Sequence, residues 1–158
     1  MTARNRRLAG RSQRRGAALA ETAIVLPLCL LFILGVFEYG RYLMMVHLCT
    51  NAAREGCRYA VSHTQPVTVG GATQGNATAD VTNVVSAYMA GQTLASQSVQ
   101  VYMSDSLGNN LGAWTNAGAG QYVCVKITGN FVSAVPNFLY MSSSLPIQAQ
   151  TVMSCEGN

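Results

Sequence analysis

A single carboxylate stands at the edge of the most apolar part of this chain. Glu21 is followed by sixteen residues without a charge, and the next acid is Glu38. Because a carboxylate that faces lipid costs a few kcal/mol, such a group is normally retained where a partner supplies the opposite charge. We therefore expect Glu21 to form an ion pair with a partner; an interfacial glutamate without a role is the alternative.

Few residues in the rest of the chain could support catalysis. Asp80, Asp105 and Glu156 are the only acids beyond residue 62, and none stands beside a histidine in a recognisable motif. No Gly-x-Ser-x-Gly sequence marks a nucleophile. His47 and His63 are sixteen residues apart without a neighbouring ligand pair, and no Cys-x-x-Cys occurs. We expect no enzymatic activity, no catalytic residues, no cofactor and no metal site.

The five cysteines raise the question of disulfides. Cys29 lies in the apolar run, and the other four, Cys49, Cys57, Cys124 and Cys155, permit three pairings in an oxidising compartment. Cys49 and Cys57 are separated by about 12 Å of rise on one expected helix, which is too far for a bridge. The sequence favours a disulfide between Cys124 and Cys155, on separate expected strands; buried free thiols are the alternative.

Basic residues are concentrated at the N-terminus. Six arginines precede residue 17, namely Arg4, Arg6, Arg7, Arg11, Arg14 and Arg15. The rest of the chain has four basic residues and six acids, a net charge of −2. The remainder has no cluster of basic and aromatic side chains that could follow a phosphate backbone. We therefore expect no binding to nucleic acid.

The apolar run next to these arginines has nearly the length of a membrane span. It extends from Ala17 to Phe37, and its sixteen uncharged residues span roughly 24 Å as a helix, against ~30 Å for the hydrocarbon layer. The arginines place the N-terminus in the cytoplasm and the C-terminal body across the membrane. A buried helix of a soluble protein is the alternative. A cleaved secretory signal is disfavoured because no small-x-small site closes the run.

The boundary between the arginines and the apolar run carries a specific pattern. In the sequence Arg15-Gly16-Ala17-Ala18-Leu19-Ala20-Glu21, glycine ends the basic leader and glutamate is the fifth residue after it. This pattern resembles the processing site of type IV pilins. The resemblance implies that a prepilin peptidase cleaves between Gly16 and Ala17, and that Glu21 pairs with the free amine of a neighbouring subunit.

Two further motifs resemble those of a TadE-type pseudopilin of the tight-adherence (Flp) pilus, over residues 14 to about 62. They are Phe37-Glu38-Tyr39-Gly40-Arg41 and Asn51-Ala52-Ala53-Arg54-Glu55-Gly56-Cys57-Arg58-Tyr59-Ala60. The family motif within the second comprises Asn51, Ala52, Ala53, Arg54, Glu55, Gly56 and Arg58. Thr22 stands where the major pilins usually have an aromatic residue, which argues against a subunit that forms the bulk of a filament.

The resemblance implies a minor pilin or pseudopilin that takes part in assembly of a tight-adherence pilus or a related secretion apparatus. Its partners would be other pilin subunits, the prepilin peptidase, an inner-membrane assembly platform and the lipid bilayer. It would be a single-pass protein of the bacterial inner membrane, with a periplasmic C-terminal domain, in or outside a surface pilus. The alternative is a membrane-tethered extracytoplasmic binding module that never enters a filament.

Residue spacing predicts an α+β, pilin-like fold in which the membrane helix continues as the spine of a small domain. An apolar stripe recurs at spacings of three and four beyond the membrane run, and its members are Val46, Cys49, Ala53, Cys57 and Ala60. Gly56 within this helix indicates a close packing contact, because glycine otherwise weakens a helix.

The expected elements define three segments. These are a basic leader over 1–16, a membrane and spine helix over 17–62, and a small α+β domain over 63–158. In the last segment we expect a loop over 62–75, a second amphipathic helix over 77–90, and a three-stranded antiparallel sheet from 98–104, 121–128 and 147–155. The apolar stretch 131–141 is either a docking surface or part of the core.

Overall fold

The chain divides into two compact units, unit 1 (Met1–Gly40) and unit 2 (Arg41–Asn158). A computed structural model describes the backbone of residues 6–69, 72–74, 77–134 and 142–156, and side chains from residue 16 onward except 67–76. The first part of the expected leader and most of the apolar stretch 131–141 therefore lie outside the described residues. Both units contain part of α1 (Arg6–Ser62), a helix of 57 residues that ends where the sequence predicts.

Unit 1 contains the apolar part of α1, and most of its described side chains are exposed, whereas Glu38 is buried. Among the described residues, one helix has the length and composition to cross a membrane, and its most apolar window is 0% buried. The exposed large apolar side chains of unit 1 are Leu19, Ile24, Val25, Leu26, Leu28, Leu30, Phe32, Ile33, Leu34, Val36 and Phe37. A helix that is apolar on all sides and uncovered suggests a membrane anchor.

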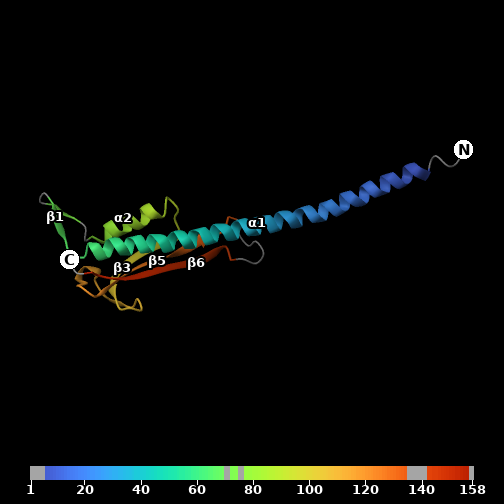
Figure 1. The fold of residues 1–158 in the computed structure, drawn as a ribbon. Coiled ribbons are helices and arrows are strands. Elements are labelled where there is room, and N and C mark those ends of the chain that lie inside the picture. Colours follow the sequence, from blue (N-terminus) through green and yellow to red (C-terminus); the bar gives the residue numbers. More distant parts are fainter. Residues whose placement is uncertain (1–5, 70–71, 75–76, 135–141, 157–158) are drawn as a thin grey trace. The chain divides into compact units, whose positions relative to one another are not determined.

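Unit 2 is an α+β domain. After α1 come β1 (Val67–Val69), β2 (Ala72–Gln74), α2 (Thr78–Tyr88), β3 (Ala95–Ser104), β4 (Asn110–Gly112), the 3₁₀ turn η1 (Trp114–Asn116), β5 (Tyr122–Val132) and β6 (Ser144–Ser154). The main sheet has four antiparallel strands in the order β4-β3-β5-β6, and β1 pairs with β2 in a separate hairpin. Helices α1 and α2 lie over the same side of this sheet (Figure 1).

The core of unit 2 lies between these helices and the sheet. The predicted stripe on α1 is buried there: Cys49, Ala53, Cys57 and Ala60 are fully buried, and Val46 packs against them. Inward-facing residues of β5 are fully buried as predicted, namely Val123, Val125 and Ile127. The tryptophan of the 3₁₀ turn, Trp114, is 3% exposed, and its indole N–H donates to the Thr78 hydroxyl at the start of α2 (3.1 Å).

The sheet has four strands, so the three-strand expectation is wrong. The missed strand β4 has only three residues, all exposed, and its Asn110-Leu111-Gly112 sequence has no alternation of apolar and polar residues. Strand β5 continues to Val132 through Gly129-Asn130, which looks like a turn in sequence, because β6 pairs with it as far as Ser144. A Cβ on Gly129 would lie 2.6 Å from Leu94 Cβ, so a side chain would not fit there.

Other boundaries differ by smaller amounts. The second helix covers Thr78–Tyr88 rather than 77–90, and Ala77 at its N-cap makes no side-chain capping bond. Gly91 follows with a φ of +77°, consistent with its expected role in ending the helix. The segment 62–75 contains the β1–β2 hairpin in place of a plain loop.

Candidate assembly interface

Glu21 lies exposed on the apolar helix of unit 1. It borders a shallow groove of about 410 Å³ on the helix surface, formed with Thr22, Val25, Leu26 and Cys29. Its neighbour Thr22 donates its hydroxyl to the Ala18 carbonyl (2.8 Å), so that polar group is satisfied within the helix. In contrast, the Glu21 carboxylate would be stabilised in lipid by a partner of opposite charge.

Gly16 and Ala17, the expected processing site, are both exposed and helical. No heavy atom lies within 4 Å of the position that a Cβ on Gly16 would occupy, so packing does not explain the glycine. A glycine lowers the helix stability locally by up to about 1 kcal/mol relative to alanine. The glycine therefore lowers the stability of the helix at this bond, and cleavage there stays a prediction.

The family motif on α1 separates into a buried and an exposed face. Ala52, Ala53 and Gly56 are buried, whereas Asn51, Arg54 and Arg58 are exposed and Glu55 is half-buried. A Cβ on Gly56 would lie 2.6 Å from Val85 Cγ2 of α2 and 3.5 Å from Val125 Cγ1 of β5. The close contact that the sequence predicts at Gly56 is confirmed, and the small residues of the motif have a structural explanation.

The structure does not bring Cys124 and Cys155 together. All five cysteines are free, and Cys49, Cys57, Cys124 and Cys155 are buried. Residues directly opposite on paired strands share a face, and Cys124 is opposite Val152 whereas Cys155 continues the face of Met153. The two thiols therefore lie on opposite faces of the sheet, so the bridge favoured by the sequence is not formed.

The buried thiols have low reactivity. Cys57 Sγ donates to the Val123 carbonyl (3.2 Å), which ties α1 to β5. Burial, followed by the nearby Cys124, raises the pKa of the Cys57 thiol to about 12. Burial likewise raises the pKa of Cys124 and of Cys155. Since the thiolate is the reactive form, these cysteines act as small apolar core residues.

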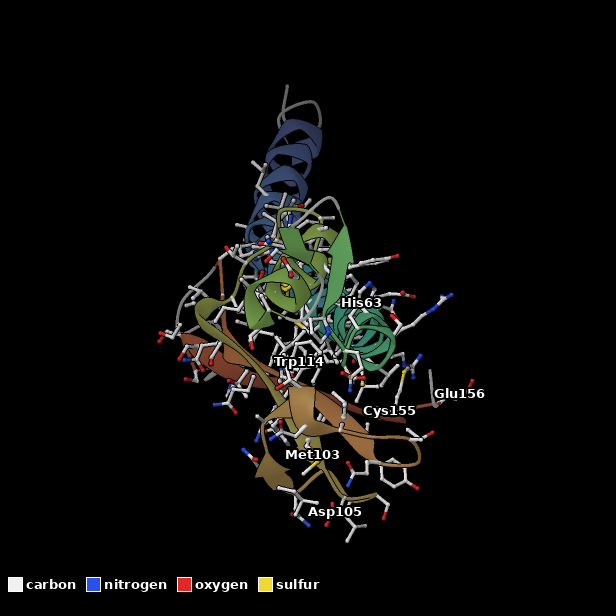
Figure 2. All side chains as sticks on the ribbon, turned by 90° about the vertical axis from the view of Figure 1, so that its left-hand side faces the viewer. His63, Met103, Asp105, Trp114, Cys155 and Glu156 are labelled. Atoms are coloured by element: carbon white, nitrogen blue, oxygen red, sulfur yellow. The ribbon has the colours of Figure 1, made fainter. Side chains whose placement is uncertain are left out.

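A larger groove lies in unit 2 where the end of α1 meets the end of β6. It has a volume of about 740 Å³, and Arg58, Val61 and Ser62 of α1 form one wall. The remaining lining residues are Tyr122, Val152, Met153, Ser154 and Glu156. Figure 2 shows Cys155 and Glu156 beside the end of α1 near His63. No local sequence signal could indicate this groove, because its walls come from segments about ninety residues apart.

Groups that could hold a metal ion are not assembled in the part of the chain that the structure describes. Within it, no three His, Cys, Asp or Glu side chains are placed to hold a metal ion. Asp105 is engaged locally: its carboxylate accepts the backbone N–H groups of Leu107 and Asn109 (both 2.9 Å) and the Asn109 side-chain amide (2.7 Å). The absence of enzymatic activity, cofactor and metal stays a prediction.

A family model described as TadE-like protein matches residues 16–58. The match begins at the processing pattern, continues through the apolar run and ends in the family motif. It confirms the resemblance that the sequence indicates, and it is consistent with a TadE-like protein of the tight-adherence pilus system. No curated protein and no solved structure matches the chain.

Proposed function

We propose that this protein is a membrane-anchored minor pilin that takes part in assembly of a tight-adherence pilus or a related secretion apparatus. Its role is structural and not catalytic. In this proposal a prepilin peptidase removes residues 1–16, unit 1 packs among the anchors of other pilin subunits, and unit 2 lies outside the inner membrane. The observation that carries it is the TadE-like match over 16–58, which joins Gly16, Glu21 and the apolar helix in one segment.

The surface of unit 1 supports association within the bilayer. Its apolar side chains need no further cover in lipid, so burial alone does not drive two anchors together there. A polar contact is a stronger reason to associate, and Glu21 is exposed on this apolar surface. In the proposed assembly the new N-terminal amine of one subunit neutralises Glu21 of the next.

Glu21→Gln tests the assembly proposal. The substitution keeps the size of the side chain and removes the charge, so we expect incorporation into the appendage to fall about tenfold or more. Incorporation is measured as the amount of the protein in sheared appendages relative to the amount in membranes. Asp80→Asn is the control, because it makes the same change from carboxylate to amide in unit 2, outside the apolar helix, and it should incorporate normally.

Processing separates this proposal from the tethered binding module. Intact-mass analysis of the membrane-resident protein should give the mass of residues 17–158. A protein that keeps residues 1–16, together with normal behaviour of Glu21→Gln, contradicts the pilin assignment and favours the binding module.

A further inference from the structure

The main sheet has two edge strands of different length, β4 with three residues and β6 with eleven. Strand β6 forms one edge, and among the described residues its backbone ladder pairs only with β5. Strand β4 forms the opposite edge with three exposed residues. Charges, lysines and prolines on edge strands are a common protection against pairing with other chains. Neither β4 nor β6 contains a charged residue, and the proline of β6, Pro146, lies eight residues before Ser154.

The strand count lets copies join in one orientation. With four antiparallel strands, the edge strands β4 and β6 run in opposite directions. A second copy displaced sideways, without being turned over, therefore places its β4 antiparallel to β6 of the first. In the assembly of the proposed function, on which this step rests, successive copies are related by such a shift. Two β6 strands would pair antiparallel only if one copy were inverted.

The two edges are also at the same level of the sheet. Asn110 of β4, Ser104, Tyr122 and Ser154 of β6 form one cross-sheet row, and Gly112, Met103, Val123 and Met153 form the next. Leu111 lies between these rows and is 59% exposed. The groove of about 740 Å³ lies at the same rows on the β6 edge, with Val61, Val152 and Met153 as its apolar lining.

Electrostatics does not oppose contact between copies. Unit 2 has four basic residues, Arg41, Arg54, Arg58 and Lys126, and four acids, Glu55, Asp80, Asp105 and Glu156, so its net charge is zero. Proteins without net charge associate more readily than those with a large charge of one sign.

We propose that unit 2 binds a second copy of this chain edge to edge, with β4 of one copy beside β6 of the next and Leu111 seated in the groove between β6 and α1. The contact is heterologous, since each copy supplies a different edge. Repetition of such a contact produces a ring or an open row of subunits rather than a closed two-fold dimer.

Cysteine crosslinking of the full chain in membranes tests this interface. Leu111→Cys and Ser154→Cys introduced together in one chain should give a ladder of dimers and larger species on mild oxidation. When the two substitutions are on separate, co-expressed chains, crosslinking should stop at dimers. All variants carry Cys29→Ala, because Cys29 is exposed whereas the other four native thiols are buried. In this background each single variant should stay at the level of the parent chain.

Two controls fix the register and the contact. Gln148 is exposed on the same strand but six residues from Ser154, so Leu111→Cys with Gln148→Cys should give no ladder. In a second control, one chain carries Leu111→Asp and Ser154→Cys, and a co-expressed chain carries Leu111→Cys. The dimer yield should not change, because the β4 edge that contacts Ser154→Cys belongs to the other chain. Leu111→Asp in an otherwise unaltered chain should lower self-association about tenfold.

Several outcomes overturn the inference. Crosslinking of Ser154→Cys to itself would show β6–β6 pairing, and an adduct of Ser154→Cys with a different protein would show another occupant. If no ladder forms, but the unaltered chain enters the appendage and Glu21→Gln does not, this interface is rejected and the pilin assignment stands. If no ladder forms and the unaltered chain does not enter the appendage, the assignment is rejected as well.

Discussion

At the scale of single residues, Gly56 is a position where the fold leaves no room for a side chain. A Cβ there would come within 2.6 Å of Val85 Cγ2 and would also approach Val125 and Val81. All three valine contacts come from elements that pack on α1 from two sides. The residue therefore sets how closely α2 and β5 approach the helix.

Gly56→Ala should destabilise unit 2 by about 1–3 kcal/mol, because overpacking outweighs the gain in helix propensity. The free energy of unfolding is measured by chemical denaturation followed by circular dichroism. Gly40→Ala is the matched control in the same helix, since nothing lies within 4 Å of its Cβ position, and it should be neutral or slightly stabilising. Equal effects of the two substitutions would contradict the packing explanation.

The loop around Asp105 should respond to acid. Hydrogen bonds from Asn109 and from nearby backbone N–H groups lower the pKa of the Asp105 carboxyl. A carboxyl with a lowered pKa stabilises the folded state above its ordinary pKa, and this contribution is lost as the pH falls through the lowered value. Amide hydrogen exchange of Leu107 and Asn109 should therefore accelerate below about pH 4, beyond the intrinsic pH trend. In Asp105→Asn this additional acid-induced change should be absent.

At the scale of elements, the contact between α1 and α2 can be tested by a double-mutant cycle. Val85→Ala removes the side chain that Gly56→Ala would strike, and alone it costs about 1–2 kcal/mol for the lost methyl groups. The double variant should be more stable than the sum of the two single effects predicts, by about 1 kcal/mol. Additive effects, measured by denaturation of all four proteins, would place the strain of Gly56→Ala elsewhere.

The sequence predicts the elements best where one segment carries its own periodic pattern. The stripe on α1 and the alternation in β5 are visible locally, and burial of Cys49, Cys57 and Val125 follows from them. Strand β4 could not be predicted, because three exposed residues have no periodicity and are held by pairing with β3. Whether Cys155 shares a face with Cys124 likewise depends on how β6 pairs with β5, where Cys124 is opposite Val152.

The candidate site divides in the same way. Gly16 and Glu21 were identified from a local pattern, and the family match covers both. Their roles in processing and ion pairing depend on a peptidase and a second subunit, and stay predictions. The groove at the end of β6 depends on residues from three distant segments, represented by Arg58, Tyr122 and Met153, so only the folded chain reveals it.

At the scale of the whole molecule, the apolar core belongs to unit 2. Every residue of the apolar core cluster, from Met45 to Cys155, lies beyond Gly40. The large apolar side chains of unit 1 are exposed and suit lipid instead.

A chain of residues 41–158 should therefore fold without the anchor and remain in solution after centrifugation. We expect a single cooperative unfolding transition, measured by circular dichroism, and native-like dispersion of its NMR spectrum. The full chain should instead resist extraction from membranes by carbonate. A fragment that lacks a cooperative transition would show that the core needs residues outside unit 2.

The chain carries its own optical reporter. Trp114 is the only tryptophan, it is almost fully buried, and its indole is bonded to Thr78 at the first turn of α2. Fluorescence excited at the indole band therefore comes from one location, where a helix end meets the 3₁₀ turn. A red shift of that emission would report in real time the separation of α2 from the 3₁₀ turn, without any label attached.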